Sequence, residues 1–158
     1  MSNKFQNPKS KIQNLNKGFT LFELLVVISI IGVLLGFGSV AFSAAQKRAR
    51  DARRKEDAKA IQNAFEQYYA LDNGNYPSLC PSSGDVFQHS DTGTVLMNNF
   101  PSDPKGSGGG WGDYSNPTCT TSAYCYCAHL ENSGTGNADG GCNFQAAAKD
   151  YFCVANLQ

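Results

Sequence analysis

Residues 17–34 read KGFTLFELLVVISIIGVL, and this stretch decides the fold. It opens a run from Leu24 to Phe42 of 19 residues without a charge. At about 1.5 Å of rise per residue, a helix of that length covers roughly 28 Å, the thickness of a bilayer core. The run has no polar face, and it is longer than the apolar region of a secretory signal, which has about 7–15 residues. We therefore expect a transmembrane helix.

The rest of the chain divides into unlike pieces around this run. Residues 1–18 carry four lysines and no acid, residues 46–70 are highly charged, and residues 71–158 are acidic, rich in turns and hold all six cysteines. A length of 158 residues leaves room for one small domain plus an appendage. The net charge is zero, which argues against a dedicated nucleic-acid binder.

The charged connector continues the helical pattern. Residues 39–73 contain no Pro or Gly, and Ala58, Ile61, Phe65 and Tyr68 recur on one helix face. Asn73-Gly74 supplies a C-terminal cap. These features predict one helix over residues 19–71 whose second half is amphipathic and needs a partner surface.

A basic cluster lies just after the apolar run: Lys47, Arg48, Arg50, Arg53, Arg54 and Lys55. We interpret it as a helix face that is solvated or level with lipid headgroups. A DNA-binding stripe fits less well, because no aromatic residues interleave to stack on bases. Positive charge on both sides of the run does not orient the helix. Since disulfides persist outside the cytoplasm, we expect residues 80–158 to be exported and residues 1–18 to be cytoplasmic.

The Cys-rich piece has short elements. The alternating, aromatic residues 122–131 and 150–156 each predict a strand, a third strand is expected near residues 111–115, and a short helix is expected over residues 95–99. The predicted class is therefore α+β, with one long helix packed on a small antiparallel sheet.

The cysteines favour disulfides over metal, because they are even in number and show no Cys-x-x-Cys and no Cys/His pair with ligand spacing. Three disulfides, or two plus free thiols, are open, and six cysteines allow 15 pairings. The six are Cys80, Cys119, Cys125, Cys127, Cys142 and Cys153.

No catalytic signature is present in the sequence: we find no zinc-protease, nucleophile-elbow, P-loop or dinucleotide motif. His89 and His129 have no ligand spacing, so a surface or structural role is expected for each. The chain is therefore predicted not to be an enzyme.

One carboxylate interrupts the apolar run near its start. A carboxylate within a membrane is costly, so Glu23 needs a compensating partner. Cleavage after Gly18 would free an amine at Phe19, which could pair with Glu23 of the same chain or of a neighbouring one.

The stretch of residues 17–34 resembles the class III signal of type IV pilins and type II secretion pseudopilins. The resemblance implies that a membrane prepilin peptidase cuts after Gly18 and N-methylates Phe19, and that Glu23 guides subunit registration during assembly. It also implies a leader of residues 1–18, a transmembrane and filament-core helix of residues 19–45, and an extracytoplasmic pilin-like head of residues 46–158.

Two weaker likenesses follow. Asn75-Tyr76-Pro77 is usual after the long helix of these families, and residues 100–106 resemble the proline-rich loop of major pseudopilins, where a calcium site follows. Lys105 replaces the usual aromatic residue, so no cofactor is predicted, and Asp103 is kept as the calcium candidate. Gly32 and Gly36 form a G-x-x-x-G that permits close helix approach.

The predicted function is that of a structural subunit of a type IV pilus-like filament or a type II secretion pseudopilus. The expected partners are a prepilin peptidase, an inner-membrane assembly platform and other pilin-like subunits, but not nucleic acid. The subunit would cross the cytoplasmic membrane once and then enter a surface filament or pseudopilus. Pilus, secretion pseudopilus and DNA-uptake filament remain open. The alternative is a membrane-anchored extracytoplasmic binding module that does not polymerise.

Overall fold

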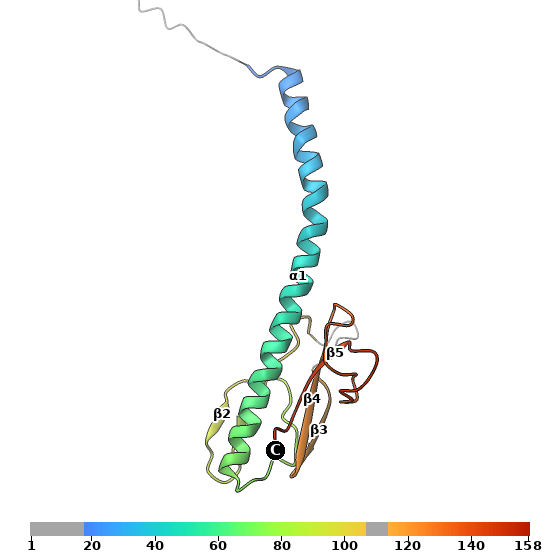
Figure 1. Ribbon diagram of the computed structural model, residues 1–158. Coiled ribbons are helices and arrows are strands. Elements are labelled where there is room, and N and C mark those ends of the chain that lie inside the picture. The colour runs from blue at the N-terminus through green and yellow to red at the C-terminus, as the bar shows by residue number, and fades with distance from the viewer. Residues whose placement is uncertain (1–17, 107–113) are drawn as a thin grey trace, which may run out of the picture. The chain divides into compact units, whose positions relative to one another are not determined.

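The computed structural model describes residues 18–106 and 114–158, which fall into two compact units. The order of elements is helix α1 (Leu21–Leu71), strands β1 (Phe87–Gln88), β2 (Val95–Met97), β3 (Ser115–Thr120), β4 (Ala123–His129) and β5 (Tyr151–Ala155) (Figure 1). The first unit ends at Val40, so α1 contributes its apolar part to that unit and its charged part to the second.

The described part of the first unit is mainly the apolar part of α1, and its side chains are exposed. An 18-residue window of α1 reaches a mean hydropathy of 2.6, with none of that window buried. The helix is thus long and apolar enough to cross a membrane. It starts at Leu21 rather than at the expected Phe19, because Thr20 caps it from outside.

The end of α1 agrees with the predicted cap. Asn73 and Gly74 have positive φ angles of 51° and 88°, and the Gly74 N–H donates to the Tyr69 carbonyl at 3.0 Å. Glycine adopts this left-handed conformation without a steric penalty, which ends the helix and turns the chain back along it.

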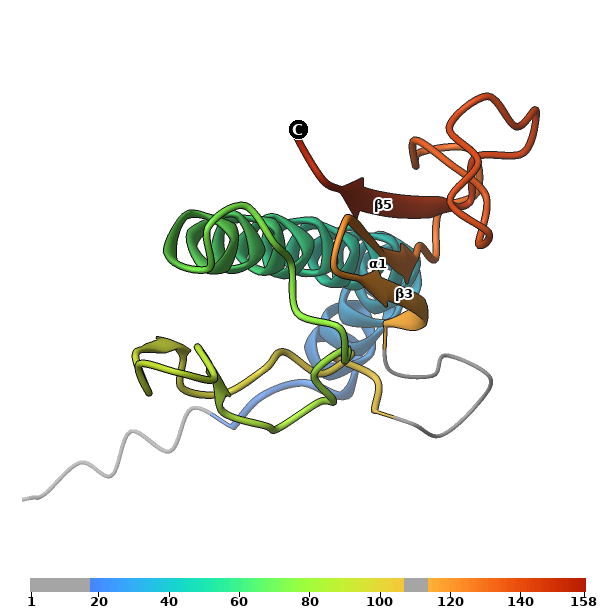
Figure 2. The same cartoon turned by 90° about the horizontal axis from the view of Figure 1, so that it is seen from below.

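The second unit packs α1 against two small antiparallel sheets. Strands β3, β4 and β5 form one sheet in that order, and β1 pairs with β2 in the other. The two sheets lie on different sides of this part of α1 (Figure 1 and Figure 2). The predicted strands over 122–131 and 150–156 are confirmed as β4 and β5. The third predicted strand falls partly outside the described residues, and β3 begins at Ser115.

The short helix expected over residues 95–99 is wrong. Residues 95–97 form β2, with Met97 paired to Phe87 and Val95 paired to Gln88. Five residues are too few for a helix to be stable by local preference, so pairing with β1 decides their conformation.

The core of the second unit is aromatic and lies between α1 and the sheets. The Phe65 side chain is fully buried, and its ring centroid lies 4.5 Å from that of Tyr124 and 4.9 Å from that of Phe87. The predicted face of Ala58, Ile61, Phe65 and Tyr68 is buried, which confirms the amphipathic second half of α1.

Candidate functional site

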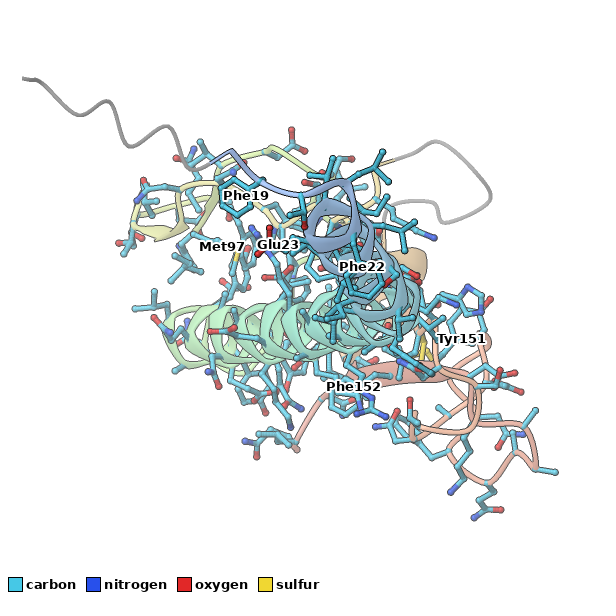
Figure 3. All side chains as sticks on the ribbon, turned by 90° about the horizontal axis from the view of Figure 1, so that it is seen from above. Phe19, Phe22, Glu23, Met97, Tyr151 and Phe152 are labelled. Carbon is cyan, nitrogen blue, oxygen red and sulfur yellow. A yellow bond between two sulfur atoms is a disulfide. The ribbon has the colours of Figure 1, made fainter. Side chains whose placement is uncertain are left out.

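A reciprocal capping box between Thr20 and Glu23 closes the start of α1. Figure 3 labels Glu23 there, together with Phe19 and Phe22. The Glu23 N–H donates to the Thr20 hydroxyl at 3.1 Å, while Glu23 Oε2 accepts from the Thr20 N–H at 2.8 Å and from the Thr20 hydroxyl at 2.9 Å. This exchange satisfies two backbone donors that a helix N-terminus otherwise leaves unpaired. Glu23 therefore has a structural role as a cap of α1.

The two carboxylate oxygens of Glu23 are used unequally. Both Thr20 bonds end on Oε2, and Oε1 accepts no hydrogen bond from the described residues. The Phe19 side chain is 89% exposed and that of Phe22 is 72% exposed. One acceptor oxygen thus remains available beside an exposed apolar surface. The partner expected for Glu23, a free amine at Phe19, would exist only after cleavage, and the leader before Gly18 lies outside the described residues.

The apolar part of α1 carries the predicted glycine pair. A Cβ built on Gly32 or on Gly36 would meet no atom within 4 Å. The two glycines are four residues apart, so they lie on one helix face and leave it smooth. Within the described chain nothing packs on this face. It is open to a neighbouring helix.

A buried ion cluster ties α1 to two loops of the second unit, and the sequence did not predict it. Arg54 is fully buried and donates to Asp103 Oδ2 at 2.6 Å and Oδ1 at 2.9 Å. It also donates to Asp51 at 2.9 Å and to Glu131 at 3.2 Å. Burial alone would lower the pKa of Arg54, but these acidic partners outweigh it and raise the pKa. Arg54 is thus a buried, paired cation, and its interpretation as part of a solvated face is wrong.

The same cluster neutralises its remaining charges internally. Glu131 accepts two hydrogen bonds from Arg50, at 2.5 and 2.8 Å, and lies 3.3 Å from the Lys105 ammonium. Hydrogen bonding from Arg50, opposed by burial, lowers the pKa of Glu131 to about 2. Burial would raise the pKa of Asp51, but hydrogen bonds from the backbone of residues 131 and 132 lower it. Asp51 and Glu131 are therefore held ionised.

Asp103, the calcium candidate, is not arranged as a cation ligand. Both of its carboxylate oxygens accept from Arg54, and Oδ1 also accepts from the Lys105 N–H at 2.8 Å. Calcium needs six to eight oxygen ligands, but this carboxylate already faces a guanidinium in a buried site. The residues present do not fit a calcium ion at Asp103.

The six cysteines are joined in three disulfides, Cys80–Cys119, Cys125–Cys142 and Cys127–Cys153. Of the two alternatives for these cysteines, the structure has three bridges and no free thiol. The last of these bridges links directly paired residues of β4 and β5.

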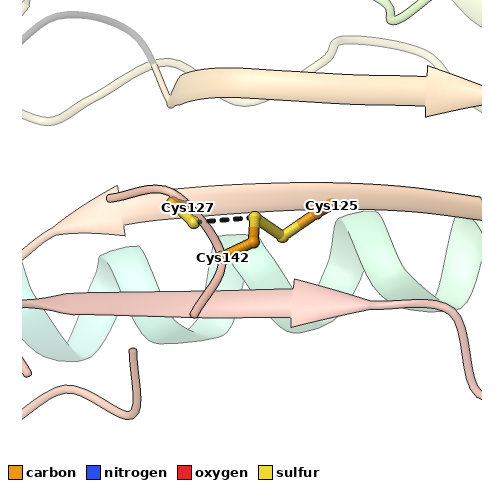
Figure 4. A group of neighbouring side chains, drawn as sticks. All are labelled: Cys125, Cys127 and Cys142. Carbon is orange, nitrogen blue, oxygen red and sulfur yellow. Dashed lines mark hydrogen bonds between the residues drawn. A yellow bond between two sulfur atoms is a disulfide. The ribbon is translucent and has the colours of Figure 1, made fainter. Parts of the chain in front are cut away.

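Three of these sulfurs lie close together. The sulfur atoms of Cys125, Cys127 and Cys142 are within 4.8 Å of one another, and Cys127 Sγ lies 3.4 Å from Cys142 Sγ (Figure 4). A half-cystine carries no thiolate, so this group is a pair of neighbouring disulfides rather than a zinc site.

Taken together, a capped α1 of 51 residues with an apolar first part and a small disulfide-bonded α+β head define a pilin-like protein. Residues 13–39 match the family described as "Prokaryotic N-terminal methylation motif". This match and the relatives below confirm the resemblance to type IV pilins and type II secretion pseudopilins. The family match and the regions aligned with the relatives each cover less than half of the chain.

The relatives come from both branches of this resemblance. The chain is 36% identical over 73 residues to a fimbrial protein of Neisseria meningitidis, covering 46% of this chain and 42% of the relative. It is 39% identical over 62 residues to type II secretion system core protein G of Escherichia coli, covering 39% and 42% of the two chains. The type IV major pilin protein PilA of Myxococcus xanthus is 33% identical over 61 residues, covering 39% and 28%. The chain thus spans less than half the length of these relatives. No solved structure matches it.

Proposed function

We propose that the chain is a structural subunit of a type IV pilus-like filament or a type II secretion pseudopilus, and that it has no catalytic activity. The observation that carries this is the placement of Glu23, capped by Thr20, at the start of an exposed apolar helix inside the matched motif. A helix whose apolar side chains find no partner in their own chain needs a membrane or neighbouring helices to cover them.

Processing and topology follow from this proposal. A prepilin peptidase would cut after Gly18 and methylate the new N-terminus at Phe19. The subunit would wait in the cytoplasmic membrane through residues 19–45, with residues 46–158 outside, until an inner-membrane platform passes it to the filament. The even set of bridged cysteines supports an exported head, because disulfides persist in oxidising compartments.

Glu23 would act through its unused oxygen. Thr20 holds Oε2, which fixes the side chain, while Oε1 is free to accept a hydrogen bond from the methylated amine of a neighbouring Phe19. A charged group costs about 2.5–3.5 kcal/mol at the centre of a membrane helix and less near its end, where Glu23 lies, and pairing with an amine offsets that cost. The pair would therefore favour one register between neighbouring helices, and the open face at Gly32 and Gly36 would allow their close approach.

The head would be stabilised without a metal. Arg54 occupies the position where a cation would face Asp103, Asp51 and Glu131, so a metal has no uncompensated acid to bind in this cluster. We propose that no cofactor is required.

The test compares the Glu23→Ala and Glu23→Gln variants with Glu56→Ala, which removes an exposed carboxylate from the charged part of α1. Both Glu23 variants should be inserted in the membrane and cleaved, yet yield less than about a tenth of the wild-type filaments, as expected when a desolvated charge pair loses one partner. Glu56→Ala should assemble normally. Wild-type filament levels in the Glu23 variants would contradict the assembly role, and a subunit that stays monomeric in the membrane would favour the non-polymerising binding module.

A further inference from the structure

One flank of α1 carries a row of cations that the ion cluster does not use. Arg48, Lys55 and Lys59 follow one another at intervals of seven and four residues, which places them along one side of a helix over about 16 Å. Arg48 and Lys59 are exposed, and Lys55 is half-buried. We call these three residues the basic flank.

The basic flank lacks acidic partners within the described chain. The Lys55 ammonium donates to the Thr135 carbonyl at 2.9 Å, and that of Lys59 donates to the Gln62 side chain at 3.2 Å. Both ammonium groups lie over the Phe152 ring, 5.7 and 6.0 Å from its centroid. These contacts hold the two lysines in place without neutralising them.

A hollow beside the basic flank gives it shape. It has a volume of about 370 Å³ and is lined by Arg48, Asp51, Ala52, Lys55, Asn132 and Thr135. The acid in this lining, Asp51, is already saturated by Arg54 and by the backbone of residues 131 and 132. The hollow therefore presents cations and neutral polar groups to a partner.

The complementary charge lies elsewhere on the same head. Residues 60–104 contain five acids and no Lys or Arg, whereas residues 46–59 contain seven Lys and Arg and three acids. Asp85 and Asp91 are exposed, as are the apolar side chains of Leu79 and Val86. Asp85, Leu79 and Val86 line a hollow of about 570 Å³. We call Leu79, Asp85, Val86 and Asp91 the acidic surface.

The two surfaces lie at different levels along α1. The acidic surface belongs to the segment that packs near the end of the helix, where Tyr68 contacts His89 and Ser90. Tyr68 is about 20 Å further along the helix than Lys55 at 1.5 Å per residue. A contact between them would therefore join copies that are shifted along the helix direction.

We infer that the basic flank of one copy docks on the acidic surface of a second copy. The partner is a copy of this chain because the chain itself supplies both charges, a cationic surface and an acidic one. A contact between two different surfaces is heterologous, so each copy still offers one free surface of each kind, and the contact can repeat into an open filament. This inference rests on the proposed function and deepens it by naming the contact between heads.

The experiment uses charge reversal and restoration in cells that make this chain as their own subunit. The basic-flank variant is Arg48→Glu with Lys59→Glu. Its matched control is Lys47→Glu with Arg53→Glu, which changes two exposed cations outside the basic flank by the same charge. The acidic-surface variant is Asp85→Lys with Asp91→Lys. A combined variant carries all four of the basic-flank and acidic-surface substitutions. Sheared filaments and the membrane-bound, disulfide-bonded subunit are measured for each.

The basic-flank and acidic-surface variants should each lower filament yield about tenfold or more, because like charges would then face each other. The amount of each variant subunit in the membrane should stay normal. The combined chain should recover at least about half of the wild-type yield, and the control should stay near wild type. Failure of the combined chain to recover, or an equal loss in the control, would overturn the inference while leaving the proposed function intact. The inference would also be overturned if the basic-flank variant assembled normally but bound phosphatidylglycerol vesicles less well, because the basic flank would then contact lipid headgroups. Absence of filaments from the wild-type chain would overturn the proposed function and the inference together.

Discussion

Arg54 and Asp103 lie 49 residues apart in the sequence and form a buried, two-pronged ion pair, with nitrogen–oxygen distances of 2.6 and 2.9 Å. Both side chains are almost fully excluded from solvent. The pair fixes the loop of Asp103 to α1. The Arg54 guanidinium lies among acidic side chains in the way that a bound metal ion would.

Removal of this cation should destabilise the head strongly. Arg54→Ala leaves Asp103, Asp51 and Glu131 without their shared partner, and we expect the free energy of unfolding to fall by about 3–5 kcal/mol. Urea denaturation of the full chain in detergent, followed by the near-ultraviolet circular dichroism of the buried tyrosines, measures this. Arg53→Ala, at the exposed neighbouring position, should change it by less than about 0.5 kcal/mol. Equal losses in the two variants would refute the role of Arg54.

Chelation should leave the head unchanged. Since Arg54 already satisfies Asp103, neither EDTA nor millimolar calcium should move the melting temperature by more than about 1 °C, because only a ligand that binds the folded state raises stability. Differential scanning calorimetry of the full chain in detergent checks this. A clear rise with calcium that is lost in Asp103→Asn would show that the acid binds a metal after all.

Acid should weaken the head through Glu131. Its pKa is about 2 in the folded head against an ordinary value of 4.5, so between these values the unfolded chain binds the proton and the folded one does not. Stability from Glu131 is therefore complete above about pH 5 and declines as the pH falls toward 2. Denaturation midpoints measured from pH 6 to pH 2.5 should fall along this range. Glu131→Gln should start lower and decline less, and a parallel decline in both chains would contradict the assignment.

The capping box should matter for assembly. Thr20→Val removes the hydroxyl that accepts from the Glu23 N–H and donates to Glu23 Oε2, so we expect a loss of about 1 kcal/mol at the helix start and a lower filament yield. Thr20→Ser keeps the hydroxyl and should behave like the wild type. Filament yield per processed subunit is the measurement. If valine and serine gave the same yield, the Thr20 hydroxyl would have no part in positioning Glu23.

The sequence predicted the elements that depend on local pattern. The apolar run, the face through Phe65 and the Asn73-Gly74 cap together predicted α1 to within two residues at its start, because periodicity and capping act over a few residues. Strands β4 and β5 were predicted from alternation. Strand β2 was missed because Val95–Met97 is too short to show a period, and its conformation depends on pairing with β1.

The ion cluster was missed for a different reason. Arg54 stands in a run of basic residues, and composition does not distinguish the one that is buried. A signal was present, since Asp51 and Arg54 extend the spacing of Ala58, Ile61 and Phe65 toward the helix start, on the buried face. A charged residue in phase with a buried face predicts an oppositely charged partner in the fold. The identity of that partner, Asp103, depends on a loop whose path the sequence does not encode locally.

The N-terminus of the mature protein shows most directly whether the chain is a processed filament subunit. The protein is extracted from membranes, and its first residue is identified by intact mass and peptide sequencing. We expect a mature chain that begins at Phe19 and carries one added methyl group. A mature chain that retains Met1–Gly18 would contradict it.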